Sequence, residues 1–212
     1  MRPLVDDDRE RLVDAFHRLS EGSRYRRFFA PVRDLSEETL DYLVEIDHHD
    51  HEAIVALDAE SGDLIGVARY VRQAPGSERA EAAVVVADDW QGLGLGRALL
   101  ERLVSRARQE GILRFTALVQ ADNRRALELL SEIGSTTRSV EGSVVELDIE
   151  LAPEPLGAPL TVALRAAAAS ALGVRPLSER TSLLARELRE ARAHPARITQ
   201  ASIRRARRDQ CS

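Results

Sequence analysis

Residues 84–96 read Val-Val-Val-Ala-Asp-Asp-Trp-Gln-Gly-Leu-Gly-Leu-Gly, and this stretch decides the fold of the chain. A β-branched run typical of a buried strand is followed by three glycines that alternate with leucines, and a long helical pattern begins at Arg97. A turn of this kind exposes backbone N–H groups at a helix N-terminus, where the helix dipole favours negative charge. Glycine also lets a ligand approach the backbone closely. We therefore predict that this turn binds a phosphate group.

Three phosphate-binding motifs can be compared with this stretch. A P-loop ends in Gly-Lys-Ser/Thr, and the chain contains no lysine. A dinucleotide-binding turn has the spacing G-x-G-x-x-G and an acid about 20 residues later, and the chain has neither. The pattern Gln-x-x-Gly-x-Gly, which begins at Gln91, fits without adjustment. A plain strand-to-helix turn that uses glycine only for its geometry is the remaining alternative.

The segment Gln91–Gly96 resembles the acyl-CoA pyrophosphate loop of the GNAT N-acetyltransferase superfamily. The order of the surrounding elements is similar too: a helix from Arg97 to about Glu110, a strand over 115–119, and a second helix that opens at Asn123 and ends at Gly134. The resemblance implies an α/β fold with a mixed central sheet of about six or seven strands. It also implies helices on both faces of the sheet and strands that splay apart at the CoA site.

The N-terminal half resembles one branch of this superfamily, the bacterial protein-lysine acetyltransferases that are often fused to a cyclic-nucleotide-binding domain. The similarity covers about residues 1–150 and rests on four segments: 18–29, 53–57, 65–70 and 80–86. A chain of 212 residues leaves no room for the cyclic-nucleotide domain. The resemblance implies acetyl transfer to a primary amine, preferably a protein lysine. A small-molecule amine and a non-catalytic CoA-binding or scaffold module with a partner-binding tail are the alternatives.

The resemblance also implies which residues hold acetyl-CoA as the co-substrate. The strand backbone would pair with the pantetheine arm and polarise the thioester carbonyl, and the loop backbone would bind the pyrophosphate. Asn123 would bond to the CoA arm, although capping of the following helix explains it equally well. The implied cofactor-binding residues are Ala83, Val84, Val85, Val86, Gln91, Gly92, Leu93, Gly94, Leu95, Gly96, Arg97 and Asn123.

Acetyl transfer to an amine also requires a base, because lysine has a free pKa of about 10.4 and is mostly protonated at neutral pH. Glu81 begins the strand that leads into the glycine loop, where a carboxylate can take a proton directly or through water. Glu81 also matches the glutamate of the Ala-Glu-x-Ala-x-x-Val pattern, which serves as general base in the branch. A solvated acid at a strand edge is the alternative. We predict that Glu81 is the catalytic residue.

The chain departs from the family pattern at the expected proton donor. Many members carry a tyrosine seven residues after the asparagine, and this chain has Leu130 there. None of Tyr25, Tyr42 and Tyr70 is assignable to that role from the sequence, so the CoA thiolate is expected to take its proton from solvent. The choice of acceptor is expected to lie in the segments 18–29 and 30–50, which flank the cleft.

The cluster Asp47-His48-His49-Asp50-His51 raises the possibility of a metal site. Helical metal pairs favour the spacing H-E-x-x-H, which is absent. The cluster lies where a helix is expected to end before a strand, so we predict a solvated loop and no metal.

Composition divides the chain into two parts at Pro153, Pro155 and Pro159. We expect an acetyltransferase domain over 1–151 and a basic Pro/Ala/Arg-rich extension over 152–212 that is partly helical or disordered. Residues 1–159 hold 19 arginines and 31 acidic residues, a net charge of −12, and residues 160–212 hold 11 arginines and 4 acidic residues, a net charge of +7. The acidic body favours cationic substrates and disfavours nucleic acid.

The remaining features of composition concern location and assembly. No apolar run is long enough for a membrane span, so no membrane contact is expected. The single cysteine, Cys211, fits a reducing compartment, and we expect a cytoplasmic protein. A homodimer is left open. The other expected elements are helices over 6–19, over 23–29 and from Ser36, strands over 2–5, 52–57, 64–71 and 80–86, and a closing hairpin over 136–139 and 143–149.

Overall fold

The computed structural model of the chain describes residues 1–152. The predictions for the order and the helices of the C-terminal extension concern residues 153–212 and lie outside the described residues.

Seven strands form one mixed sheet, which confirms the predicted α/β fold. Their order is β1-β2-β3-β4-β5-β7-β6. β4 and β5 run parallel, and every other neighbouring pair in this sheet is antiparallel. The strands are β1 (Arg2–Pro3), β2 (His51–Leu57), β3 (Leu64–Arg72), β4 (Arg79–Val86), β5 (Arg114–Gln120), β6 (Gly134–Glu141) and β7 (Val144–Leu151).

The helices begin where the sequence offers capping side chains. The Ser20 and Ser36 hydroxyls accept the backbone N–H of Ser23 and Thr39, each at 3.2 Å, and so cap α2 and α3. The first helix differs from its prediction, because residues 6–8 form a short 3-10 helix, η1, before the α-helix begins. The helices are η1 (Asp6–Asp8), α1 (Arg9–Arg18), α2 (Glu21–Phe28), α3 (Glu37–Val44), η2 (Asp88–Trp90), α4 (Leu95–Gln109) and α5 (Arg124–Ser131).

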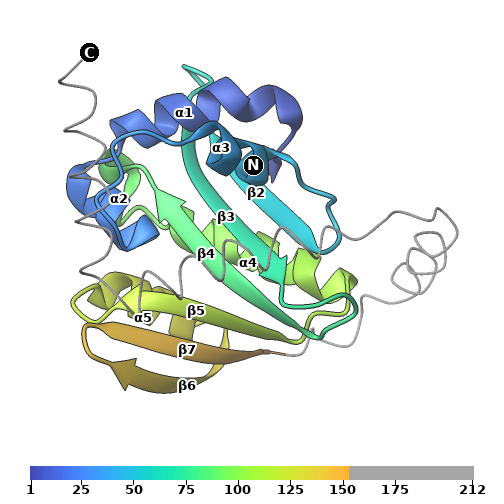
Figure 1. Ribbon diagram of the computed structural model, residues 1–212. Helices are drawn as coiled ribbons and strands as arrows, with labels where there is room; N and C mark the ends of the chain where they lie inside the picture. The colour runs from blue at the N-terminus through green and yellow to red at the C-terminus, as the bar shows by residue number, and fades with distance from the viewer. Residues whose placement is uncertain (153–212) are drawn as a thin grey trace, which may run out of the picture. The chain divides into compact units, whose positions relative to one another are not determined.

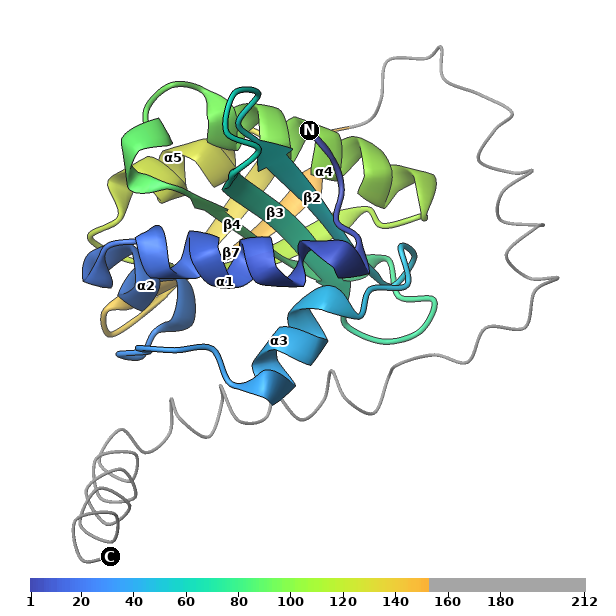
Figure 2. The same cartoon turned by 90° about the horizontal axis from the view of Figure 1, so that it is seen from above.

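Helices cover both faces of the sheet, as predicted. Figure 2 shows α4 and α5 on one side of the strands and α1 and α3 on the other. On the first side, Leu99 and Leu103 of α4 belong to the same buried core as Tyr70 and Phe115 of the sheet. On the second side, Leu12 and Leu43 pack with side chains of β2 and β3 such as Val55 and Val67. The sheet is therefore a buried layer, and burial of apolar side chains on its two faces is the main stabilising force.

No helix within the described part of the chain is long and apolar enough to cross a membrane.

Candidate active site

The centre of the sheet contains a gap between two neighbouring strands. β4 and β5 are paired over three residues only, Arg79–Glu81 against Arg114–Thr116. Beyond Glu81, β4 stays paired with β3 up to Val86, whereas β5 stays paired with β7. Figure 1 shows the two strands diverging from this point. The divergence is the splay predicted from the sequence, and it leaves one edge of β4 without a strand partner among the described residues.

The backbone of β4 presents its polar groups to this gap at every second residue. In a strand, the N–H and C=O of one residue point to the same side, and successive residues alternate. The Arg79 carbonyl accepts a hydrogen bond from Gln73 of the loop after β3, and the Ala87 N–H donates to Ile65 of β3, so odd-numbered residues face β3. The backbone groups of Val84 and Val86 consequently face the gap, and those of Ala83 and Val85 face β3. Of the four strand residues predicted to contact a cofactor, two are directed toward the gap.

The glycine loop lies between the end of β4 and the start of α4. Gly92 and Gly94 have φ of +79° and +85°, a left-handed conformation that glycine adopts without strain. Gly94 is the N-cap of α4 and provides no side chain to bond the first N–H groups of that helix. A Cβ on Gly96 would lie 3.0 Å from the Leu129 side chain, so glycine also allows α4 to approach α5. The loop therefore leaves a helix N-terminus open for an anion.

Two side chains at the loop were not predicted in their present roles. The Gln91 amide donates to the Val86 carbonyl at 3.1 Å and so ties the loop to the end of β4. The Arg125 guanidinium lies 3.7 Å from the position that a Cβ on Gly92 would occupy, and it adds positive charge beside the loop. Sequence reasoning missed Arg125 because its place depends on how α5 packs against α4. The Arg97 side chain, in contrast, pairs with Glu101 and Glu132.

Asp88 connects the loop region to α2. Its carboxylate accepts the Ser20 N–H at 2.8 Å and the Ser23 hydroxyl at 2.6 Å. Although burial opposes ionisation of Asp88, these hydrogen bonds hold its pKa below the ordinary value. The Gln91 amide also lies 3.4 Å from the Ser23 hydroxyl. The chain before the glycine loop and the start of α2 are therefore held together by a single carboxylate.

Glu81 lies at the point where the two strands separate. It is the last residue of β4 that is paired with β5, opposite Thr116, and its side chain is exposed. Strand alternation places it on the same face as Ala83 and Val85. Arg27 of α2 exerts an attraction on its carboxylate, and Tyr42 of α3 also interacts with it electrostatically. The predicted base is thus exposed at the closed end of the gap, with a cation nearby.

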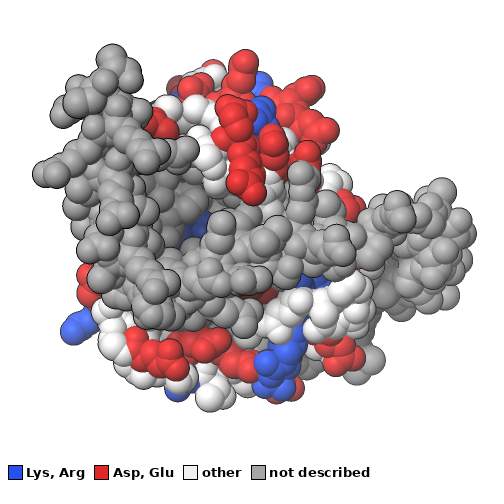
Figure 3. All heavy atoms as spheres, viewed as in Figure 1, with Lys and Arg blue, Asp and Glu red and all other residues white. Residues whose placement is uncertain are grey.

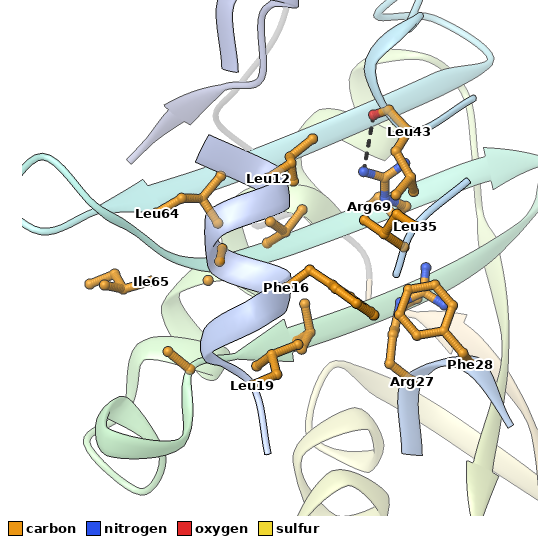
Figure 4. A pocket seen from close by; sticks show the side chains of 16 residues that line it. Leu12, Phe16, Leu19, Arg27, Phe28, Leu35, Leu43, Leu64, Ile65 and Arg69 are labelled. Carbon is orange, nitrogen blue, oxygen red and sulfur yellow. Dashed lines mark hydrogen bonds between the residues drawn. The ribbon is translucent and has the colours of Figure 1, made fainter. Parts of the chain in front are cut away.

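An apolar pocket adjoins β4 on this same face. Its volume is about 600 Å³, including space open to solvent, and it lies between α1, α2 and the β3–β4 pair. Figure 4 shows Phe16 of α1 and Phe28 of α2 projecting toward one another above the strands. Leu19, Arg27, Phe28, Leu35 and Leu43 line the pocket, so the segments 18–29 and 30–50, in which the choice of acceptor is predicted to lie, both contribute to it.

Neither Leu130 nor Tyr70 brings a free hydroxyl to the gap. Leu130 is buried in the core beneath α5. Tyr70 is fully buried and donates to the His49 carbonyl at 3.1 Å, and burial raises the pKa of its hydroxyl. The Asn123 side-chain oxygen accepts the Ala126 N–H at 3.2 Å, which makes Asn123 the N-cap of α5. Its NH₂ group is the part left for a ligand.

The histidine cluster is only in part the solvated loop that its sequence predicted. Residues 47–50 lie in a loop, and the His48 and His49 side chains are 41% and 51% exposed. His51 is buried in β2 instead, and its Nε2 accepts a hydrogen bond from Arg69 at 3.1 Å. Burial and the charge of Arg69 lower the pKa of His51 to about 3. His48 bonds to the buried Glu52 at 2.8 Å, and His49 bonds to Glu110, just after α4, at 2.5 Å. The prediction was wrong for His51, because its partner Arg69 is distant in the sequence.

Within residues 1–152, no three histidine, cysteine, aspartate or glutamate side chains are grouped to hold a metal ion.

Comparison with known proteins identifies the family. The family model described as Acetyltransferase (GNAT) family matches residues 14–134, more than half of the chain. The chain belongs to the GNAT acetyltransferase family. The splayed strands and the glycine loop described above are therefore features of a GNAT acetyltransferase.

Relatives and solved structures agree with this assignment. The chain is 37% identical over 136 residues to Acetyltransferase PA5475 of Pseudomonas aeruginosa, a match that covers 63% of this chain and 73% of that protein. It is 33% identical over 153 residues to Acetyltransferase Pat of Mycolicibacterium smegmatis, covering 72% of this chain but only 46% of that longer protein. The crystal structure of the GNAT domain of S. lividans PAT matches with a TM-score of 0.65 and 33% identity, over 71% of this chain and 89% of that chain.

Proposed function

We propose that this GNAT protein transfers the acetyl group of acetyl-CoA directly to a primary amine, with a protein lysine as the preferred acceptor. The observation that carries the proposal is the gap beside β4, which has an open helix N-terminus at one end and the exposed carboxylate of Glu81 at the other. Both substrates would meet in this gap, so the reaction needs no acetylated form of the enzyme. The family and the fold support an acetyltransferase, and the branch resemblance supports a protein acceptor.

The donor side would be formed mainly by backbone groups. The loop Gln91–Gly96 and the first turn of α4 offer N–H groups to the CoA pyrophosphate, and Arg125 adds a positive charge. Val84 and Val86 direct their backbone groups into the gap, where they suit the pantetheine arm. An N–H of this strand that bonds to the thioester carbonyl would stabilise the negative charge that develops on its oxygen. The Asn123 NH₂ group completes the proposed donor site.

The acceptor side would supply the base. Glu81 takes a proton from the ammonium group, and the free amine attacks the thioester carbonyl carbon. The new C–N bond forms in a tetrahedral intermediate, and its nitrogen loses its second proton to solvent. The C–S bond then breaks, and the CoA thiolate takes a proton from solvent because Leu130 stands where a hydroxyl would be needed. Figure 3 shows acidic side chains gathered over the α1–α3 region and along the β5–β7 layer of the viewed face. Such a surface attracts cationic amines.

The test is Glu81→Gln, assayed by release of the CoA thiol with a set of amines and lysine peptides. We expect kcat/KM to fall by about 100-fold or more while the Kd for acetyl-CoA stays unchanged. Glu78→Gln is the matched control, because Glu78 is an exposed glutamate just before β4. Unchanged turnover in Glu81→Gln would reject Glu81 as the base. Binding of acetyl-CoA without thiol release for every amine would favour the non-catalytic CoA-binding module.

A further inference from the structure

The pocket between α1, α2 and the β3–β4 pair contains two arginines in otherwise apolar surroundings. Arg27 and Arg69 are its only charged lining residues. Figure 4 shows both side chains at the same end of the pocket, beside Phe28 and Leu35, while Leu19, Leu64 and Ile65 lie toward the other end. The apolar lining comprises Leu12, Ala15, Phe16, Leu19, Phe28, Leu35, Leu43, Leu64, Ile65, Val67, Ala83, Val85 and Ala87. The pocket is therefore divided into a cationic end and a hydrocarbon end.

The two arginines differ in how well they are satisfied. Arg69 donates to the His51 ring at 3.1 Å and to the Leu43 carbonyl at 3.2 Å. Arg27 makes no hydrogen bond or ion pair within residues 1–152 and has its guanidinium carbon 5.3 Å from the centre of the Phe28 ring. A guanidinium has five N–H donors. Arg27 is half-buried, so its donors are available to a ligand that enters the pocket.

The electrostatics of this end favour an anion. Burial lowers the pKa of Arg27, and burial together with the charge of Arg27 lowers the pKa of Arg69 to about 9. The two guanidinium groups are therefore close enough to repel one another in a medium that screens charge poorly. A carboxylate placed between them would relieve the repulsion and accept charge-assisted hydrogen bonds from both.

The position of Arg27 beside Glu81 also limits which acceptors can approach the base. Arg27 attracts the Glu81 carboxylate, and its positive charge repels an ammonium group that approaches the same carboxylate. An acceptor that carries its own negative charge near the amine avoids this repulsion. Its ammonium group would face Glu81 and its carboxylate would face Arg27, so the charges of the acceptor and the site would match.

We propose that Arg27 and Arg69 bind a carboxylate that the acceptor carries close to its amine, with the hydrocarbon part of the acceptor in the apolar end of the pocket. The proposal rests on the proposed acetyl transfer and names the acceptor class. Two sources supply this chemistry: a free amino acid with an apolar side chain, or an acidic residue next to a lysine in a peptide. Arg27 and Arg69 then determine specificity, while Glu81 takes the proton.

The experiment compares matched acceptors with acetyl-CoA as the donor. One pair is leucine and leucinamide, and the other is a lysine peptide with glutamate beside the lysine and the same peptide with glutamine there. We expect wild type to prefer the carboxylate member of one pair by about 10- to 100-fold in kcat/KM, and the pair that shows the preference identifies the source. Arg27→Gln should abolish the preference. Arg26→Gln, an exposed arginine on the same helix, should keep it.

Three results would overturn the proposal. Arg27→Gln could lower turnover equally for both members of each pair, which would mean that Arg27 serves Glu81 and not a carboxylate. Wild type could show no preference in either pair. Arg27→Gln could erase a preference for succinyl-CoA over butyryl-CoA instead, which would place the carboxylate on the donor. Ratios within a pair are compared between variants, so differences in amine basicity cancel.

Two further measurements distinguish a failure of the carboxylate proposal from a failure of the proposed acetyl transfer on which it rests. Turnover of leucinamide or the glutamine peptide by wild type reports the proposed acetyl transfer alone. Binding of N-acetylleucine and N-acetylleucinamide, followed by the shift in Tm, needs no turnover, and only the carboxylate form should raise the Tm of wild type more than that of Arg27→Gln. We expect the Tm of the ligand-free variant to stay close to that of wild type, because the half-buried Arg27 makes no hydrogen bond or ion pair within residues 1–152. A large drop in its Tm would mean that Arg27 serves the fold and not a ligand.

Discussion

The two sides of β4 are built in different ways. The gap toward β5 is formed by backbone groups of one contiguous segment, residues 84–97, whose shape depends on two left-handed glycines. The pocket on the α1–α2 side is formed by side chains that come from residues 12–87, on three helices and two strands. A site of backbone groups tolerates many side chains but few changes of backbone conformation. A site of side chains tolerates small changes of backbone conformation but few changes of side chain.

One strand serves both sites because its residues alternate. Val84 and Val86 give their backbone groups to the gap, whereas Ala83 and Val85 give their side chains to the pocket. The gap and the pocket are thereby separated by the thickness of a single strand, with Glu81 at the point where β4 and β5 part. The comparison of the two sides can be tested by substitutions that act on only one of them.

The largest effect is expected when the pH is lowered, because acid destabilises the part of the protein that is built from side chains. The pKa of His51 is about 3 in the folded chain and about 6.5 when unfolded, so below pH 6.5 the unfolded chain binds the extra proton. The free energy of unfolding should therefore fall as the pH drops from about 6.5 toward 3, by roughly 2 kcal/mol at about pH 5. Urea unfolding of wild type and His51→Asn should show a stability gap at about pH 8 that shrinks by this amount at about pH 5. A gap that is constant with pH would contradict the prediction.

The next effect is expected from the backbone-built region. Gly94→Ala places a Cβ at φ of +85°, so we expect the loop to shift and the KM for acetyl-CoA to rise about tenfold. Gly111→Ala is the matched control, because Gly111 has φ of +76° just after the other end of α4 and a Cβ there meets nothing within 4 Å. Both variants should lose similar stability, about 1 kcal/mol, and only the first should lose affinity for acetyl-CoA. Equal KM values would show that the loop geometry does not matter.

The smallest effect is expected from Arg125, whose guanidinium lies beside the glycine loop. Arg125→Gln should raise the KM for acetyl-CoA by about threefold at low salt, because an exposed charge contributes modestly to phosphate binding. The difference should disappear at about 0.5 M NaCl, where exposed charges are screened. Arg124→Gln, the exposed neighbour, should leave KM unchanged. A loss as large as that of Gly94→Ala would mean that side chains, and not the backbone, dominate the donor side.

The backbone-built side could be predicted from the sequence and the side-chain-built side could not. In residues 84–96 the turn and the helix start follow one another directly, so the loop was predictable, as were the caps at Ser36 and Asn123. Glycine was informative because the conformation it allows is a local property. The start of α4 was misplaced only by two residues, at Arg97 instead of Leu95.

The missed features depend on partners that are far apart in the chain. The place of Arg27 in the pocket depends on the packing of α2 over β3 and β4, and nothing near residue 27 in the sequence signals it. His51 was assigned to solvent because its neighbours are polar, yet Arg69 lies 18 positions away and bonds to it. The helix over 6–19 began later than predicted because Asp8, which is fully buried, bonds to Arg2 and to the backbone of Val5. Burial of a polar side chain is decided by tertiary contacts and not by the local pattern.

The carboxylate of Asp88 links the gap side and the pocket side of β4. It accepts hydrogen bonds from Ser20, the N-cap of α2, and from Ser23, and it stands three residues before Gln91, which fixes the glycine loop to β4. If a bound donor moves the loop, we expect the start of α2, which lines the pocket, to move with it, and this would link the two proposed substrates thermodynamically. We expect each to change the affinity of the other by the same factor, since such coupling is reciprocal. Asp88, which contacts neither proposed ligand, would then set the cooperativity between them.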